Sequence, residues 1–102
     1  MTDSEIYSWI LLATSLASQT APTDIVGISM IADGINHAVP TEKELKTSLC
    51  WLINRKLISR ENKKYKLTEL GKSTYDMANS NANFLSEIWI NLEIKLNKLL
   101  KP

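Results

Sequence analysis

The sequence predicts an α+β fold that is mostly helical, with one two-stranded hairpin set between helices. Apolar residues recur at three- and four-residue steps in three stretches up to residue 54, which indicates helices. The pattern changes to alternation over 57–68, which indicates two strands, and the helical period then returns. At 102 residues, 44% hydrophobic and 23% charged, the chain has the size and composition of one globular domain.

The first two predicted helices begin at residues that cap a helix N-terminus. Thr2 and Glu5 have the spacing of a capping box, and an apolar face follows them to about residue 17. Thr23 and Asp24 are good capping residues for a second helix, which we expect to end near Asn36.

The third predicted helix has the clearest start in the sequence, because a capping box from Thr41 to Glu44 directly follows Pro40. Helical spacing separates a stripe expected to be buried from an opposite, polar face. The stripe is Leu45, Leu49, Leu52 and Ile53, and the polar face is Glu42, Lys43, Lys46, Thr47, Cys50 and Asn54.

A hairpin is predicted directly after this helix. Residues 57–60 and 65–68 alternate between apolar and polar side chains and flank a polar, basic tip at 61–64. Thr68 then begins another helix. The sequence therefore predicts two short strands with a charged turn at their far end.

The last predicted helix, about 83–100, carries apolar residues with the spacing of a coiled coil. We expect 1–78 to form one folded domain and 79–102 to form a helix that pairs with a second copy in a homodimer, because an exposed apolar stripe usually marks an interface. The alternative is that this helix folds back on the domain's own core. The residues expected at the dimer interface are Leu85, Ile88, Trp89, Leu92, Leu96 and Leu99.

Charge is unevenly distributed along a chain whose formal net charge is only +1. Residues 42–72 hold nine Lys and Arg residues against four Glu residues, a net charge of +5. The rest of the chain holds three basic and seven acidic residues, a net charge of −4. A concentrated basic segment is typical of proteins that bind nucleic acid.

Several function classes are disfavoured by composition. One cysteine (Cys50) and one histidine (His37) cannot make a disulfide framework or a clustered Cys/His metal site. No glycine-rich phosphate loop or paired-carboxylate motif is present, so we expect no catalytic residue, no cofactor and no enzyme activity. The acidic N-terminus is unlike a secretory signal, and the apolar stretch at 6–17 is shorter than the ~20 residues of a membrane span. We expect a cytoplasmic protein that does not bind membranes.

The order of the elements and two short motifs resemble the winged helix-turn-helix superfamily. Residues 52–58 (LINRKLI) look like the end of the recognition helix and the beginning of the wing, and 65–71 (YKLTELG) is similar to the second wing strand and its exit into the next helix. Lys56 stands where the family often has glycine. The resemblance covers about 7–77 and is to small bacterial regulators of the MarR and PadR type. It implies a winged helix-turn-helix with a two-stranded wing and an added C-terminal helix.

This resemblance implies a dimeric transcriptional regulator that binds double-stranded DNA at a palindromic site. Its recognition helix (about 41–56) would lie in the major groove, and its wing (about 57–68) would contact the backbone. Lys43, Lys46 and Thr47 are the candidates to face base edges, while Asn54 and Arg55 are placed to reach phosphates. The candidate wing contacts are Arg60, Lys63, Lys64 and Lys66.

An alternative function keeps the fold without DNA binding, as a winged-helix protein-interaction module. Glu42 and Glu44 favour it, because acidic side chains at the head of a recognition helix repel phosphates. The two functions are distinguished by whether the basic side chains converge on one face or are interrupted by acidic ones. A small-molecule effector is a further possibility, in a pocket formed by Tyr75, Met77 and Trp89.

Overall fold

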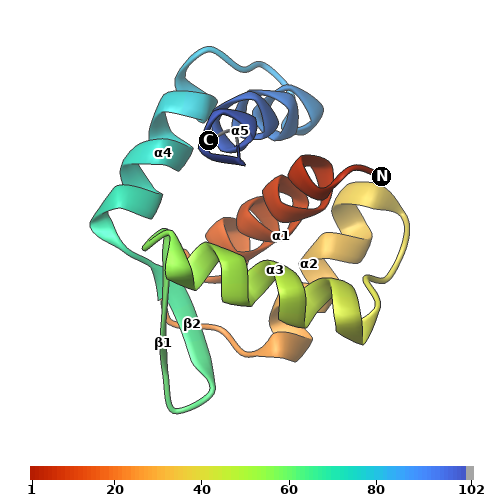
Figure 1. Ribbon diagram of the computed structural model, residues 1–102, viewed down its shortest axis with the longest axis vertical. Helices are drawn as coiled ribbons and strands as arrows, with labels where there is room; N and C mark the ends of the chain where they lie inside the picture. The colour runs from red at the N-terminus through yellow and green to blue at the C-terminus, as the bar shows by residue number, and fades with distance from the viewer. Residues whose placement is uncertain (101–102) are drawn as a thin grey trace.

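The computed structural model describes residues 1–100, and within them the fold is α+β and mostly helical (Figure 1). The elements are α1 (Asp3–Ala17), α2 (Ile25–Asn36), α3 (Glu42–Asn54), β1 (Ile58–Glu61), β2 (Lys64–Leu67), α4 (Glu69–Ser80) and α5 (Leu85–Leu100). This order is the one expected from the sequence, and it is compatible with a winged-helix layout.

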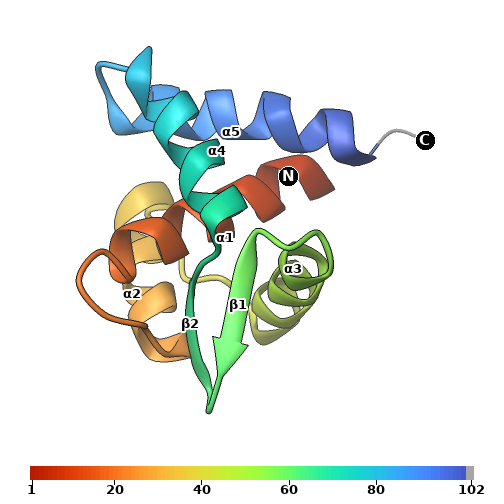
Figure 2. The same cartoon turned by 90° about the vertical axis from the view of Figure 1, so that its left-hand side faces the viewer.

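Helix α1 is the central element of the core. Figure 2 shows it running beneath α5, with α2, α3 and the hairpin on its other side. Its side chains from Tyr7 to Ser15 are all buried, because helices pack on both of its sides. The indole of Trp9 donates a hydrogen bond to the carbonyl oxygen of Ala32 at 2.9 Å, which fixes α1 against α2. The predicted capping box of Thr2 and Glu5 is confirmed.

The connection from α2 to α3 is set by local signals. His37 ends α2 in the left-handed conformation, with φ of 54°. The hydroxyl of Thr41 accepts from the amide of Glu44 at 3.0 Å, and the carboxylate of Glu44 accepts from the amide of Thr41 at 2.9 Å. This confirms the predicted capping box and fixes the direction in which α3 leaves the turn.

The hairpin has the predicted register, but each strand lies one residue closer to the turn than expected. Ile58 pairs with Leu67 and Arg60 with Tyr65, so the strands are 58–61 and 64–67 and the turn has two residues. Asn62 and Lys63 have φ of 52° and 64°. Two successive left-handed residues match the right-handed twist of the paired strands, which is why such a tight turn closes this hairpin.

The middle of the hairpin also contacts the segment before α2, which the sequence does not predict. Thr23 and Tyr65 form an isolated antiparallel bridge, with N–H to O distances of 2.9 and 2.7 Å. The hairpin is therefore attached to the chain segment that leads into α2.

The junction from the hairpin to α4 requires a glycine. A Cβ atom at Gly71 would lie 2.0 Å from the carbonyl oxygen of Leu57, so α4 can approach the strand only without a side chain there. Lys56, just before the strand, has φ of 63°, a conformation in which glycine carries no steric cost. The side chain of Thr68 links the two, accepting from the amide of Gly71 and donating to the carbonyl of Lys56.

The predicted dimer interface on the last helix is wrong at its centre. Ile88, Leu92 and Leu96 are buried against the chain's own α1, so the alternative in which the helix folds back is what the structure shows. Trp89 also faces α1, where its indole lies 3.1 Å from the carbonyl oxygen of Glu5. The 3–4 spacing identifies an apolar face, but the same face can be covered by its own chain or by another.

The two ends of this stripe, Leu85 and Leu99, remain partly exposed. Because α5 contributes to the same hydrophobic core as α1, residues 79–100 pack with the rest of the fold and do not extend from it. The boundary expected at residue 78 falls inside α4, which continues to Ser80.

Candidate nucleic-acid interface

The outer face of α3 carries side chains expected to contact DNA. The candidates for base edges, Lys43, Lys46 and Thr47, are exposed, as are Cys50 and the phosphate candidate Asn54. At 3.6 residues per turn, they lie within an arc of about 100° on the helix surface. The opposite side of α3 is buried, so this arc is the part of α3 that a ligand could reach.

A groove of about 360 Å³ joins this face to the hairpin. Lys46, Cys50 and Asn54 line it from α3, and Arg60 and Tyr65 line it from the two strands. The guanidinium of Arg60 lies over the ring of Tyr65, 5.8 Å from its centroid, and is held there by a cation–π contact. We call this surface the α3–hairpin groove. It brings together three of the predicted site residues, from two elements.

Two ion pairs place acidic groups beside predicted DNA-contact lysines, one on α3 and one on the far side of the hairpin. The Lys46 ammonium is 2.7 Å from a carboxylate oxygen of Glu42, one turn earlier on α3. The hydrogen bond from Lys46 lowers the pKa of Glu42 below its ordinary value, and the same bond raises the pKa of Lys46. Both groups are therefore charged at neutral pH, and each reduces the other's field. Lys64 lies 3.9 Å from the carboxylate of Asp24 at the start of α2.

The basic residues of the hairpin do not share one face. Cross-strand partners lie on the same side of a sheet, so Arg60 and Tyr65 face the helices, while Lys64 and Lys66 lie on the opposite side. Lys64 is paired directly with Glu61 in the strand register. Lys63 is at the turn itself, where it is exposed. Of the four candidate wing contacts, Lys64 and Lys66 therefore lie on the face of the hairpin away from the α3–hairpin groove.

Arg55 is also separated from the α3–hairpin groove. Its guanidinium lies 5.2 Å from the ring centroid of Trp51, which in turn stacks on Tyr7 of α1 at 4.7 Å. Lys43 and Thr47 border a shallow hollow on this same α1 side of the helix. Burial raises the pKa of the Tyr7 phenol, with a smaller contribution from the charge of Asp3.

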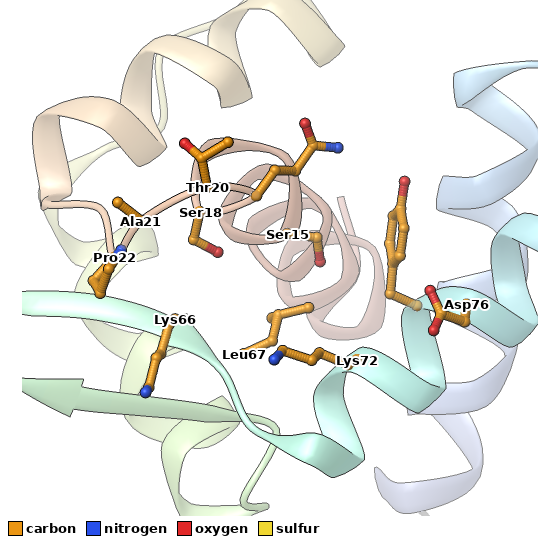
Figure 3. Close-up of a pocket in the computed structure, with 11 residues that line it drawn as sticks. Ser15, Ser18, Thr20, Ala21, Pro22, Lys66, Leu67, Lys72 and Asp76 are labelled. Atoms are coloured by element: carbon orange, nitrogen blue, oxygen red, sulfur yellow. The ribbon is translucent and has the colours of Figure 1, made fainter.

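A hollow of about 410 Å³ lies elsewhere, between the end of α1 and α4 (Figure 3). Lys66 and Lys72 reach it from β2 and α4, on either side of Leu67. The hydroxyls of Ser15 and Ser18 already donate to carbonyl oxygens of α1, at 2.8 and 2.6 Å. Thr20, Tyr75 and Asp76 also line the hollow, so it holds two cations beside a carboxylate and two further hydroxyl groups.

The effector pocket expected from Tyr75, Met77 and Trp89 is not formed. Tyr75 lines the hollow beside α1, Met77 lines a different one between α4 and α5, and Trp89 packs on α1. Successive positions of a helix point in different directions, which is why nearness in sequence did not bring Tyr75 and Met77 together.

In residues 1–100, no group of three or more His, Cys, Asp and Glu side chains could hold a metal ion. None of the helices in residues 1–100 has the length and apolar character needed to cross a membrane. Comparison of the chain with protein-family models, curated proteins and solved structures finds no match. The geometry and charge of α3 and the hairpin are therefore the features that indicate a function.

Sequence reasoning missed the contacts that two residues make with predicted DNA-contact side chains. Tyr65 was expected only as a strand residue, although it supports Arg60 in the groove. Asp24 was expected only as a helix cap, although it also pairs with Lys64. Alternation along the strands could have placed Arg60 and Tyr65 on one side, but the pairing with Asp24 depends on how α2 meets the hairpin.

Proposed function

We propose that this chain is a winged-helix DNA-binding protein that acts as a transcriptional regulator. The observation that supports this most strongly is the α3–hairpin groove, where Lys46, Asn54 and Arg60 face solvent together. In both views the hairpin extends away from the helices beside α3, as a wing does (Figure 1, Figure 2).

In this proposal α3 lies in the major groove and the hairpin follows the adjacent phosphates. The 13 residues of α3 make a helix of about 20 Å, and its exposed arc can enter a groove about 12 Å wide. Thr47 can exchange hydrogen bonds with base edges, Lys43 can donate to a guanine, and Asn54 is placed to reach a phosphate. Lys63, at the exposed turn, and Arg60 are placed to contact phosphates.

The Glu42–Lys46 pair must rearrange when DNA binds. Lys46 can exchange the carboxylate for a phosphate or a base acceptor. Glu42 then remains near the DNA, where it either repels phosphates or accepts from a cytosine amino group. We therefore expect the protein to bind more weakly to DNA sequences that have no cytosine opposite the start of α3.

The test is binding of the purified chain to labelled duplexes, followed by fluorescence anisotropy over a salt series. Binding should weaken steeply with salt, with a slope of about 0.9 per phosphate neutralised. Lys63→Ala should weaken binding to all sequences equally and reduce the slope by about 1, whereas Lys43→Ala should reduce discrimination between sequences. Lys95→Ala, on α5, removes the same charge away from this surface and should leave the slope unchanged.

A protein-interaction module on the same fold is the second candidate. The observation that favours it is the neutralisation of basic side chains by Glu42 and Asp24, at 2.7 and 3.9 Å. A surface of alternating charge suits a polar protein partner better than a uniformly anionic duplex. Absence of DNA binding at low salt would refute the first proposal and favour this one.

A further inference from the structure

The outer face of α5 carries an apolar patch that the chain's own core leaves uncovered. Ile90 and Ile94 are 55% and 53% exposed. At 100° per residue they point away from Leu92, which packs on α1. Glu87 lies about one turn before Ile90 on this side of the helix, and Lys98 lies one turn after Ile94. We call the row Glu87, Ile90, Ile94 and Lys98 the outer row of α5.

The order of charges along the outer row fits a second copy of the same row that runs in the opposite direction. If two α5 helices meet antiparallel, Glu87 of one copy lies beside Lys98 of the other, and Ile90 lies beside Ile94. The ion pair and the apolar contact then each occur twice, as a two-fold axis requires. A parallel arrangement instead places Glu87 beside Glu87 and Lys98 beside Lys98, which costs free energy, and it also aligns the two helix dipoles.

We propose that two copies of this chain pair antiparallel through the outer row of α5. The occupant of this face is a second copy because the charge order of the row fits its own reverse. This dimer uses the side of α5 opposite to the stripe expected from the sequence. It therefore leaves Ile88, Leu92 and Leu96 buried in each protomer.

The position of this interface determines where the two proposed DNA surfaces lie, a step that rests on the proposed function. Both views show α5 at one end of the molecule and the hairpin tip at the other (Figure 1, Figure 2). A dimer formed through the outer row presents its two α3–hairpin grooves at opposite ends. Such a dimer cannot place both α3 helices in successive major grooves ~34 Å apart on one duplex, as a palindromic site requires. It would instead bridge two separate duplex segments.

The first experiment measures the mass of the full chain in solution by analytical ultracentrifugation over a range of concentrations, without DNA. The expected result is a dimer that Ile94→Glu converts to a monomer. Met30→Glu is the matched control, because Met30 is an apolar side chain, 70% exposed, on α2; this variant should remain dimeric. A monomeric wild type, or a dimer unaffected by Ile94→Glu, would overturn the proposal.

Charge reversal tests the antiparallel arrangement. Glu87→Lys and Lys98→Glu should each raise the dimer dissociation constant about tenfold, because each reversal acts at two symmetric positions. The double variant should return it close to the wild-type value. Glu87 also accepts from the amide of Asn83 at 3.2 Å, so the unfolding of each variant is measured in the Ile94→Glu monomer. Two weakened single variants without rescue in the double variant would overturn the antiparallel pairing.

A bridging assay separates this inference from the proposed function. One duplex is fixed on beads and a second, labelled duplex is offered in solution with the protein. Wild type should retain the labelled duplex, and Ile94→Glu should bind each duplex alone without retaining the second. A dimer that binds DNA without bridging would overturn the placement of the surfaces at opposite ends. A dimer that does not bind DNA would refute only the proposed function.

Discussion

Replacement of Leu92 by alanine tests whether α5 belongs to the core of a single chain. Leu92 is 0% exposed and packs in the same apolar cluster as the side chains of α1. Truncation of a fully buried leucine typically lowers the free energy of unfolding by 2–5 kcal/mol, and we expect about 3 kcal/mol here because both sides of the α1–α5 contact are buried. If Leu92 lies within one protomer, this loss is independent of protein concentration.

The assay is urea denaturation followed by tryptophan fluorescence, at concentrations about a hundredfold apart. Ile90→Ala is the control on the same helix, since Ile90 is half exposed on the outer face. In the dilute sample, Ile90→Ala should lower the free energy of unfolding by less than about 1 kcal/mol. The result that would refute the reasoning is a loss of unfolding free energy in Leu92→Ala that is below about 1 kcal/mol in the dilute sample and grows with protein concentration. It would instead favour the dimer interface first expected from the sequence.

Three further predictions concern the hairpin junction, acid stability and DNA affinity. Gly71→Ala should destabilise the fold by about 1–3 kcal/mol, because the new Cβ meets a backbone carbonyl. Gly34→Ala, with no atom within 4 Å of its new Cβ, should stabilise α2 by up to about 1 kcal/mol; equal thermal shifts for the two variants would contradict this. The backbone N–H that donates to Glu5 lowers the pKa of this carboxyl, so the unfolded chain binds its proton more readily than the folded chain. The advantage of wild type over Glu5→Gln should thus be present at pH 7 and decline between about pH 5 and pH 3, and an advantage that increases with acid would refute the assignment. Glu42→Gln should tighten DNA binding several-fold at low salt, because it removes a carboxylate 2.7 Å from an α3 lysine; weaker binding would mean that the carboxylate positions this lysine for DNA.

The parts of the fold predicted correctly from the sequence depend on signals close together in the chain. The capping boxes at Thr2 and Thr41 lie within four residues each, so the starts of α1 and α3 follow from local chemistry. The turn was predicted two residues too long because Asn62 and Lys63 form a left-handed turn without a glycine to mark it. Neither Asn62 nor Lys63 is by itself a residue type that identifies the two positions of the turn.

The parts that were not predicted depend on contacts between distant segments. The apolar stripe of α5 was identified correctly, but whether α1 or a second chain covers it cannot be read from spacing. The bridge between Thr23 and Tyr65 joins residues 42 positions apart, with no pattern at either end. Within the candidate site, α3 was placed correctly on the surface, while the separation of Arg60 from Lys66 required the register of the two strands.

The measurement that tests the central proposal most directly is a map of backbone amide chemical shifts on addition of duplex DNA. The proposed surface predicts changes concentrated at Lys46, Asn54, Arg60 and Lys63, with α5 unaffected in the Ile94→Glu monomer. Changes on α4 and α5 with none at the α3–hairpin groove would contradict it.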